Sequence, residues 1–416
     1  MKKGEKYIFG RSRQKQNQLT DPTSIQLDAP RNEYYEAVSV RFGHAQVILF
    51  VALFAFVILS FLRNSELITY RNFYYFFKDL NASAESVDLT GLSSVTYPTD
   101  DEQSFTLYRN GLAVAGNQSV TVFSATGRQT VSKLLEHYSH PVAVGSGKYL
   151  LVYESGGTRY SLYNFYNLIH SGSTEYPIAS ATVSECGMYA LISSSESYNS
   201  VVLLYNDRFE LINRYNKNSY VMDACIDEKG SRLTVLSSAL ENGAFATKAE
   251  IYKPGASEAE ATVSLGNAIG IECTYADPSH LIVLCSNEAY FLKSDGRVLE
   301  KHSFEGETVR FADLGAHGLA LCMDGRIISE KNTIILFDKT GKMLYNNTVP
   351  EKIEQIAANE DAVYLLFSGG VRRVLYREGG EESVLPANTE ERVMLALGKN
   401  ELLLCSPQKA VYLQFD

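Results

Sequence analysis

Cysteine and histidine side chains are the residues of this sequence that could ligate a metal ion or act as nucleophiles. The two closest histidines are His137 and His140, and two ligands without a third do not form a metal site. No two cysteines form a C-x-x-C pair, and their wide spacing argues against a zinc knuckle. We therefore predict no metal site. The six cysteines are Cys186, Cys225, Cys273, Cys285, Cys322 and Cys405.

Cys273 and Cys285 are the best local candidates for a disulfide, which an exported protein could form. In the hairpin that we predict here, Cys273 faces Val283, and Cys285 lies diagonal to Cys273. Diagonal neighbours are roughly 7 to 8 Å apart, too far for a disulfide without distortion. We interpret all six cysteines as buried strand residues.

No known catalytic motif occurs in the sequence. It contains no G-x-S-x-G elbow, no H-E-x-x-H helix, no Walker loop and no dinucleotide fingerprint. The acidic pairs Asp100-Asp101, Glu360-Asp361 and Glu381-Glu382 fall in predicted turns, where solvated charge is usual. We predict no catalytic or cofactor-binding residue and no cofactor. An enzyme whose site is assembled from distant loops stays open, but we favour a protein without catalytic activity.

Tyrosine is unusually abundant, with 27 residues, while tryptophan is absent. The densest segment runs from Tyr153 to Tyr166. Tyrosine and arginine together suit recognition surfaces. We favour the simpler interpretation, in which the rings pack between sheets and the hydroxyls reach water, and keep a ligand-binding face as the alternative.

An uncharged apolar run from Ala45 to Leu62 precedes all these residues. Its 18 residues make about 27 Å of helix, close to the thickness of a bilayer core. A buried core helix would keep a polar stripe, and a signal peptide would have a shorter leader and a small-residue cleavage site. We predict an uncleaved transmembrane helix, with the lipid bilayer as a partner.

Charge is unevenly distributed around this run. Residues 1–44 hold eight basic and five acidic side chains, whereas residues from 81 onward hold 27 basic and 41 acidic ones. The acidic body argues against nucleic acid as a partner. We predict a single-pass protein of the plasma membrane, with a cytoplasmic N-terminus and an extracytoplasmic C-terminal domain.

An aromatic stem follows the predicted anchor. Aromatic rings flanked by Lys or Arg favour the membrane interface or a partner, and the alternative is a helix that caps the next domain. The interfacial candidates are Tyr70, Phe73, Tyr74, Phe76 and Phe77. The predicted domains are a disordered cytoplasmic tail (1–44), a transmembrane helix (45–62), a stem and linker (63–86) and an extracytoplasmic domain (87–416).

The outer domain consists of short apolar runs bounded by turn residues, which predicts an all-β fold. The hexapeptides F-S-A-T-G-R, L-K-S-D-G-R and F-D-K-T-G-K, which begin at Phe123, Leu292 and Phe337, share a glycine suited to a tight hairpin turn. Repeating units start near residues 103, 140, 176, 219, 269, 307, 352 and 390, the spacing of propeller blades. We predict a β-propeller of eight blades, alternatively seven, in which residues 93–97 complete the last blade.

The tail, the anchor, the stem Asn72-Phe73-Tyr74-Tyr75-Phe76-Phe77-Lys78-Asp79-Leu80 and the propeller together resemble a known family. It is a bacterial domain-of-unknown-function family of single-pass, membrane-anchored, WD40-like propeller proteins. The resemblance covers nearly all the chain from residue 45. It implies an architecture but no activity, because the family has none assigned.

These features favour a protein-interaction scaffold in the cell envelope, with a protein partner in the membrane or envelope. The first alternative is a sensor or a module that binds carbohydrate or peptide at the mouth of the propeller channel. The second is a propeller hydrolase or lyase. An apolar or aromatic patch would favour the scaffold, and converging acidic, basic and histidine side chains in a deep pocket would favour an enzyme.

Overall fold

The structure is a computed structural model of the chain. It describes residues 33–63, 94–135, 137–241, 243–304, 306–324, 332–377, 380–387 and 393–415. The chain divides into two units, residues 1–76 and 77–416, which are described separately here.

The first unit contains helix α1 (Glu33–Arg63). This helix includes the predicted span from Ala45 to Leu62 but starts well before it. The prediction of disorder up to residue 44 is therefore wrong for residues 33–44. An α-helix satisfies its backbone hydrogen bonds within the segment whether or not its side chains are apolar, so the helix can extend beyond the apolar run.

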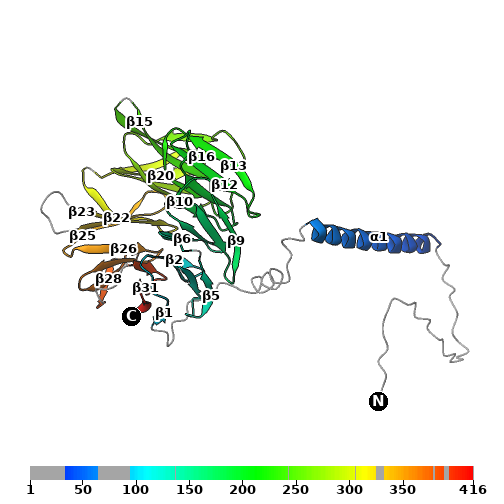
Figure 1. Ribbon diagram of the computed structural model, residues 1–416, viewed down its shortest axis with the longest axis horizontal. Coiled ribbons are helices and arrows are strands. Elements are labelled where there is room, and N and C mark those ends of the chain that lie inside the picture. The colour runs from blue at the N-terminus through cyan, green and yellow to red at the C-terminus, as the bar shows by residue number, and fades with distance from the viewer. Residues whose placement is uncertain are drawn as a thin grey trace, which may run out of the picture. The chain divides into compact units, whose positions relative to one another are not determined.

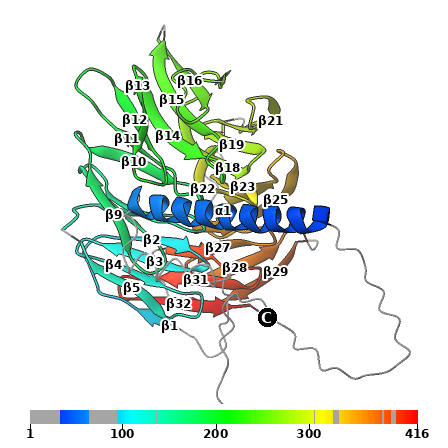
Figure 2. The same ribbon diagram turned by 90° about the vertical axis from the view of Figure 1, so that its right-hand side faces the viewer.

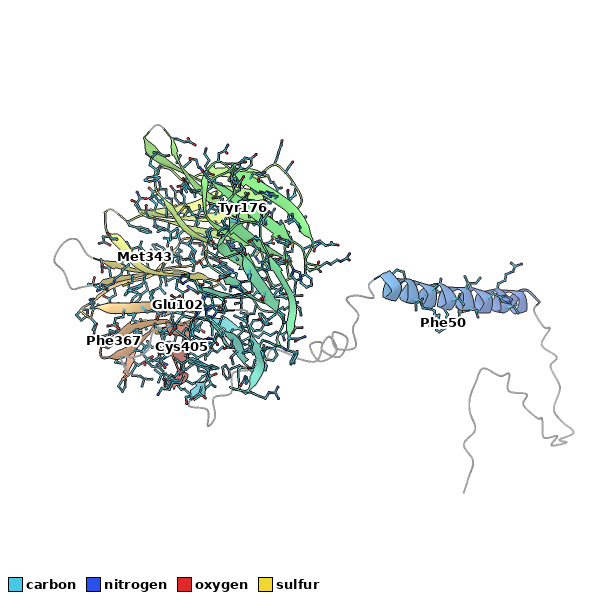
Figure 3. All side chains as sticks on the ribbon, viewed as in Figure 1. Phe50, Glu102, Tyr176, Met343, Phe367 and Cys405 are labelled. Carbon is cyan, nitrogen blue, oxygen red and sulfur yellow. The ribbon has the colours of Figure 1, made fainter. Side chains whose placement is uncertain are left out.

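Most of the described side chains of α1 are apolar and exposed, as Phe50 illustrates (Figure 3). Within the described part of the chain, no helix combines the length and the apolar character that crossing a bilayer requires. The stem candidates Tyr70, Phe73, Tyr74, Phe76 and Phe77 lie outside the described residues, as do residues 1–32.

The described residues of the second unit form eight four-stranded antiparallel sheets, which confirms the eight-bladed β-propeller (Figure 1). Blades 1 to 4 are built from β2 (Gln103–Tyr108), β3 (Gly111–Gly116), β4 (Ser119–Phe123), β5 (Gln129–Leu134), β6 (Pro141–Gly145), β7 (Leu150–Glu154), β8 (Arg159–Tyr163), β9 (Leu168–Ser173), β10 (Ile178–Val183), β11 (Tyr189–Ser193), β12 (Ser200–Tyr205), β13 (Leu211–Lys217), β14 (Tyr220–Ile226), β15 (Leu233–Glu241), β16 (Ala244–Tyr252) and β17 (Ala261–Ser264).

Blades 5 to 8 continue in chain order, and the last blade combines both ends of the propeller. Their strands are β18 (Gly270–Asp277), β19 (His280–Cys285), β20 (Glu288–Lys293), β21 (Val298–Ser303), β22 (Thr308–Gly315), β23 (Gly318–Asp324), β24 (Asn332–Phe337), β25 (Met343–Val349), β26 (Ile353–Ala358), β27 (Val363–Phe367), β28 (Gly370–Leu375), β29 (Glu381–Leu385), β30 (Val393–Ala396), β31 (Glu401–Cys405), β32 (Lys409–Gln414) and β1 (Ser94–Thr96).

The ring is held together at its centre and closed at its seam. The first strands β2, β6, β10, β14, β18, β22, β26 and β30 contact one another consecutively, and β30 returns to β2. In the last blade, β1 pairs with β32 through Val95 opposite Ala410 (Figure 2). This pairing confirms the prediction that a strand before the first blade completes the last one, and it covers the edge of β32 that would otherwise be free.

Side-chain burial follows each strand's place in its blade. The second strands are covered on both faces by neighbouring blades, so β3 is buried at every residue. The outermost strands are covered less, and β21 is mostly exposed. Clusters of apolar side chains therefore lie between blades, for example Leu236 of blade 4 with Leu281 of blade 5.

The turns between third and fourth strands use glycine as predicted. Gly127, Gly296 and Gly341 all have positive φ, at 72°, 89° and 92°. Each N–H donates to the carbonyl three residues earlier and tightens the turn. In blade 3 the same position is taken by Phe209, with φ 67°. Its ring stacks on His170 at a centroid separation of 4.5 Å.

Gly341→Ala should destabilise the propeller more than Gly243→Ala. Both glycines have positive φ, but a Cβ on Gly341 would lie 2.6 Å from the Cβ of Glu300, whereas one on Gly243 meets no described atom within 4 Å. We expect losses of roughly 2–3 and about 1 kcal/mol in the free energy of unfolding. Urea denaturation followed by circular dichroism measures both, and equal losses would contradict the packing argument.

Candidate functional site

The cysteines and histidines singled out in the sequence do not converge on a metal site. All six cysteines are free thiols, and Cys186 differs from the prediction because it lies half-buried in a turn. The pairing of Cys273 with Val283 is confirmed. His140 is exposed, and its Nδ1 lies 3.1 Å from Glu102 Oε2. Among the described residues, no group of three His, Cys, Asp or Glu side chains is placed to hold a metal ion.

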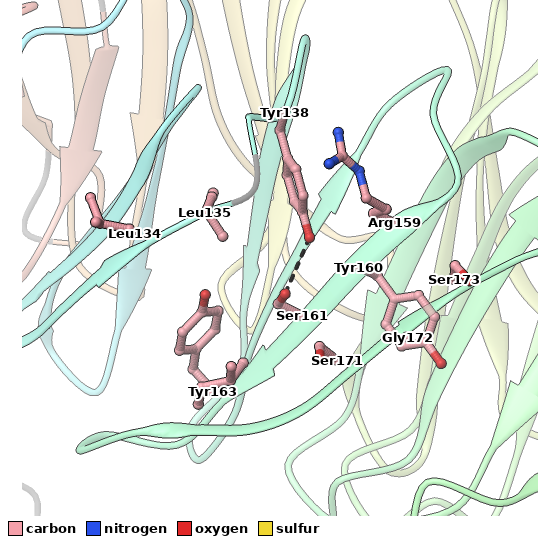
Figure 4. Close-up of a pocket in the computed structure, with 11 residues that line it drawn as sticks. Leu134, Leu135, Tyr138, Arg159, Tyr160, Ser161, Tyr163, Ser171, Gly172 and Ser173 are labelled. Carbon is pink, nitrogen blue, oxygen red and sulfur yellow. Dashed lines mark hydrogen bonds between the residues drawn. The ribbon is translucent and has the colours of Figure 1, made fainter.

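The tyrosine-rich segment lines a pocket of about 500 Å³ between blades 1 and 2 (Figure 4). The pocket is bounded by β8, β9 and the connection that follows β5. Tyr160 and Tyr163 are almost fully buried, which agrees with the interpretation that these rings pack between blades. Its lining residues are Leu134, Leu135, Tyr138, Arg159, Tyr160, Ser161, Tyr163, Leu168, Ser171, Gly172 and Ser173.

Polar groups of this pocket take part in hydrogen bonds with each other and with neighbouring residues. The Tyr138 and Ser161 hydroxyls are 3.1 Å apart, and Arg159 Nε donates to Glu154 Oε2 at 3.1 Å. Burial opposes ionisation of Glu154, but hydrogen bonds from Ser139 and Arg159 outweigh it and hold the pKa of Glu154 below its usual value. The pocket thus presents hydroxyl groups and an arginine that is paired with Glu154.

Three carboxylates lie on consecutive inner strands, β14, β18 and β22. Asp223 Oδ2 accepts the N–H of Cys273 at 2.8 Å, and Asp313 Oδ2 accepts the N–H of Ala358 at 2.6 Å. Each of these bonds joins one blade to the next. Glu272 lies between them on β18, and the charges of Asp223 and Asp313 both contribute to raising its pKa. These side chains form an acidic wall on one side of the ring's centre.

The carboxyl groups of the acidic wall have raised pKa values, so they lose their protons at higher pH than usual. Burial raises the pKa of Asp223 to about 6, although bonds from Cys273 and Ala224 oppose the shift. Desolvation, followed by the charges of Asp223 and Asp313, raises the pKa of Glu272 to about 7. Solvent still reaches the Glu272 side chain. A cation brought to this position would therefore stabilise carboxylates that repel one another.

Two exposed apolar residues, Met222 and Ile271, directly precede Asp223 and Glu272 in the chain, and further ones lie on the β15–β16 hairpin. Leu240 and Phe245 face each other near the tip of the long β15–β16 hairpin, and they are 70% and 44% exposed. Figure 1 shows the hairpin projecting beyond the neighbouring blades. We call this set of exposed residues the hairpin rim. Its members are Tyr198, Tyr220, Met222, Leu240, Phe245 and Ile271.

Backbone contacts show that the rim spans blades 3 to 5. The N–H of Val221 donates to Ser200 Oγ at 3.0 Å, which joins blade 4 to blade 3. The N–H of Gly270 donates to Ser238 Oγ at 3.2 Å, which joins blade 5 to blade 4. Tyr198, Tyr220 and Ile271 lie within two residues of these bonded groups. The rim residues therefore belong to one edge of three adjacent blades.

Two rim residues are exposed because of β-bulges. The ladder between β14 and β15 shifts register around Met222, and the ladder between β18 and β19 shifts around Ile271. A bulged residue has no partner directly opposite it on the neighbouring strand. It therefore interrupts the regular alternation of side chains between the two faces of the sheet. In each case the following residue is acidic, Asp223 or Glu272. Sequence reasoning missed this site, because a bulge breaks the period on which strand patterns depend.

Comparisons with known proteins identify a family but no activity. The profile described as a family of unknown function, DUF5711, matches residues 88–410. A comparison with curated proteins found no match.

Solved structures share the propeller architecture. Sqt1 from Saccharomyces cerevisiae matches with a TM-score of 0.54 and 8% identity over 78% of this chain and 98% of that chain. BamB from Moraxella catarrhalis matches with a TM-score of 0.52 and 13% identity over 78% of this chain and 99% of that chain. At these identities the similarity establishes the fold alone.

Glu272→Gln should stabilise the protein at pH 8 and have little effect at pH 5. Because the pKa of Glu272 is raised above its ordinary 4.5, the folded state holds the proton more tightly than the unfolded state. Its contribution to stability is therefore lost as the pH rises through about 7. Solvent access limits the gain to less than about 1 kcal/mol. Thermal denaturation at both pH values measures it, and an equal effect at each would contradict the assignment.

Proposed function

Because the chain belongs to DUF5711, a family of unknown function, membership transfers no activity, and we propose a function from the geometry. The protein is a membrane-anchored, extracytoplasmic scaffold that binds another protein of the membrane or cell envelope through the hairpin rim. The observation that carries this proposal is the exposed apolar pair Leu240 and Phe245 on the projecting hairpin.

The hairpin rim has the composition of a docking surface. Burying apolar area contributes about 25 cal/mol per Å², and exposed clusters of such side chains mark interaction sites. Aromatic residues and methionine are enriched at interfaces, and Tyr198, Tyr220, Met222 and Phe245 supply them here. A folded domain gains nothing from exposing these side chains to water, whereas a partner that covers them gains binding free energy.

The neighbouring charges define the kind of partner. Asp223 and Glu272 place carboxylates directly beside Met222 and Ile271. We therefore propose a partner surface with an apolar centre and basic residues at its border. Lys or Arg side chains there would offset the repulsion within the acidic wall and orient the complex.

The anchoring part of the proposal rests on the sequence of the apolar run from Ala45 to Leu62, because no helix among the described residues is itself long and apolar enough to cross a bilayer. This run lies within the helical segment α1, and helices satisfy their own backbone hydrogen bonds, as lipid requires. The N-terminus is proposed to be cytoplasmic and the propeller extracytoplasmic. The aromatic stem would then sit at the bilayer surface.

Protease treatment of sealed cells tests the orientation. We expect external protease to degrade the propeller and to leave a small N-terminal fragment with α1, because only the propeller lies outside. A C-terminal domain that survives in intact cells and is cut after lysis would overturn the orientation. A full-length chain that washes off membranes in alkaline carbonate would overturn the anchor.

Leu240→Asp and Phe245→Asp should each weaken partner binding roughly tenfold or more, because a buried charge replaces an apolar anchor. Crosslinking in intact membranes, followed by identification of the proteins bound to the full-length chain, measures the effect. Leu211→Asp is the matched control, since Leu211 is 51% exposed but lies outside the rim.

The three variants separate the possible outcomes. All substitute exposed residues, so folding should change by less than about 0.5 kcal/mol. Loss of the same partner in both rim variants but not in Leu211→Asp supports the proposal. Equal recovery in all three excludes the rim as the docking site. If the full-length chain captures no specific protein while the outer domain binds glycans, the scaffold function is wrong.

A further inference from the structure

Two buried thiols from different blades face each other across the interface between blades 4 and 5. Cys225 lies on β14 and Cys273 on β18, the inner strands of these blades. Both belong to the apolar cluster that fills this interface, and they are 6% and 4% exposed. Each thiol is close enough to the other to contribute to the shift of its pKa. The two residues are far apart in sequence, so only the ring of blades brings them together.

Hydrogen bonds between blades flank this contact on both sides. On one side, Asp223, two residues before Cys225, accepts the N–H of Cys273 at 2.8 Å. On the other side, Thr234 pairs with Cys225 across the β14–β15 ladder, and its hydroxyl lies 2.7 Å from that of Tyr275. The backbones of β14 and β18 are thus held in place close to the two sulfurs.

The other cysteines lack such an arrangement. Cys285 lies in the same cluster but on β19, where its ladder partner is Gly270. Cys322 lies in the apolar cluster between blades 6 and 7, and Cys405 lies in the cluster at the seam of the ring. Cys186 lies in a turn, 3.0 Å from the Ser184 hydroxyl.

We propose that Cys225 and Cys273 form a disulfide that joins blade 4 to blade 5 when the protein folds in an oxidising compartment. The oxidant is a small disulfide such as oxidised glutathione. One cysteine thiolate attacks it, forms a mixed disulfide and releases one reduced glutathione. The second cysteine thiolate then attacks the protein sulfur of that mixed disulfide and releases the second glutathione. Two protein thiols lose two electrons and two protons in total, and the oxidant gains them.

The environment of the thiols indicates when the bond forms. Burial raises the pKa of Cys225, and the hydrogen bond from its neighbour together with burial raises that of Cys273. Neither is a reactive thiolate in the folded protein near neutral pH. We therefore expect the disulfide to form while blades 4 and 5 assemble, and to be protected from reductants afterwards. It would then stiffen the part of the ring that supports the hairpin rim.

The experiment refolds the full-length chain from urea and detergent into a buffer of reduced and oxidised glutathione. Remaining thiols are blocked with iodoacetamide, and non-reduced proteolytic peptides are analysed by mass spectrometry. We expect one crosslinked peptide pair that contains Cys225 and Cys273, four alkylated cysteines, and separation of the pair on reduction. The oxidised protein should unfold several degrees higher than the reduced one.

Matched variants keep the test independent of folding yield. Cys285→Ser should retain the crosslink, whereas Cys225→Ser should lose it and should show no shift in unfolding temperature on reduction. As a second measurement, thiols titrated in denaturant should number four after refolding with oxidised glutathione and six after refolding with reduced glutathione alone. A refolded chain with a β-sheet spectrum and six alkylated cysteines would overturn the proposal. A crosslink between any other two cysteines would overturn it as well.

Discussion

The structure depends on one constraint: a four-stranded sheet has two apolar faces and can bury both only between two neighbours. Each blade therefore needs the next one, and the last blade needs the first. The pairing of β1 with β32 meets this need, because it builds the final blade from both ends of the propeller. The apolar clusters that stabilise the domain accordingly lie between blades rather than within them.

This arrangement explains where polar groups can be tolerated. At the centre of the ring, side chains such as Asp223 and Asp313 reach across to backbone N–H groups of the adjacent blade and satisfy donors that would otherwise be left unpaired. The cost is a set of carboxylates close to one another. Burial and mutual repulsion raise the pKa values of these carboxyl groups. When ionised, the carboxylates create a negative potential beside the hairpin rim.

In the same arrangement, the residues that stabilise the fold and the residues that we propose bind a partner lie in different parts of the blades. Turns such as those at Gly296 and Gly341 fit against neighbouring strands and serve the fold. The β15–β16 hairpin extends past the packed region, so its tip is free of packing constraints and can expose Leu240 and Phe245. The pocket between blades 1 and 2 shows the opposite case, since its arginine is bonded to Glu154 and the Tyr138 and Ser161 hydroxyl groups are bonded to each other.

The sequence by itself determined the all-β class, the eight repeating units, the glycine turns and the closing strand, because each follows from local alternation, turn chemistry or spacing. It also determined the apolar run from Ala45 to Leu62, although not that helix α1 begins at Glu33. Only the tertiary structure decided the acidic wall, the hairpin rim and the contact between Cys225 and Cys273. Those features join residues from different blades or follow β-bulges that shift the register of a strand. No local sequence pattern shows which side chains meet across two blades or where a strand ladder shifts register.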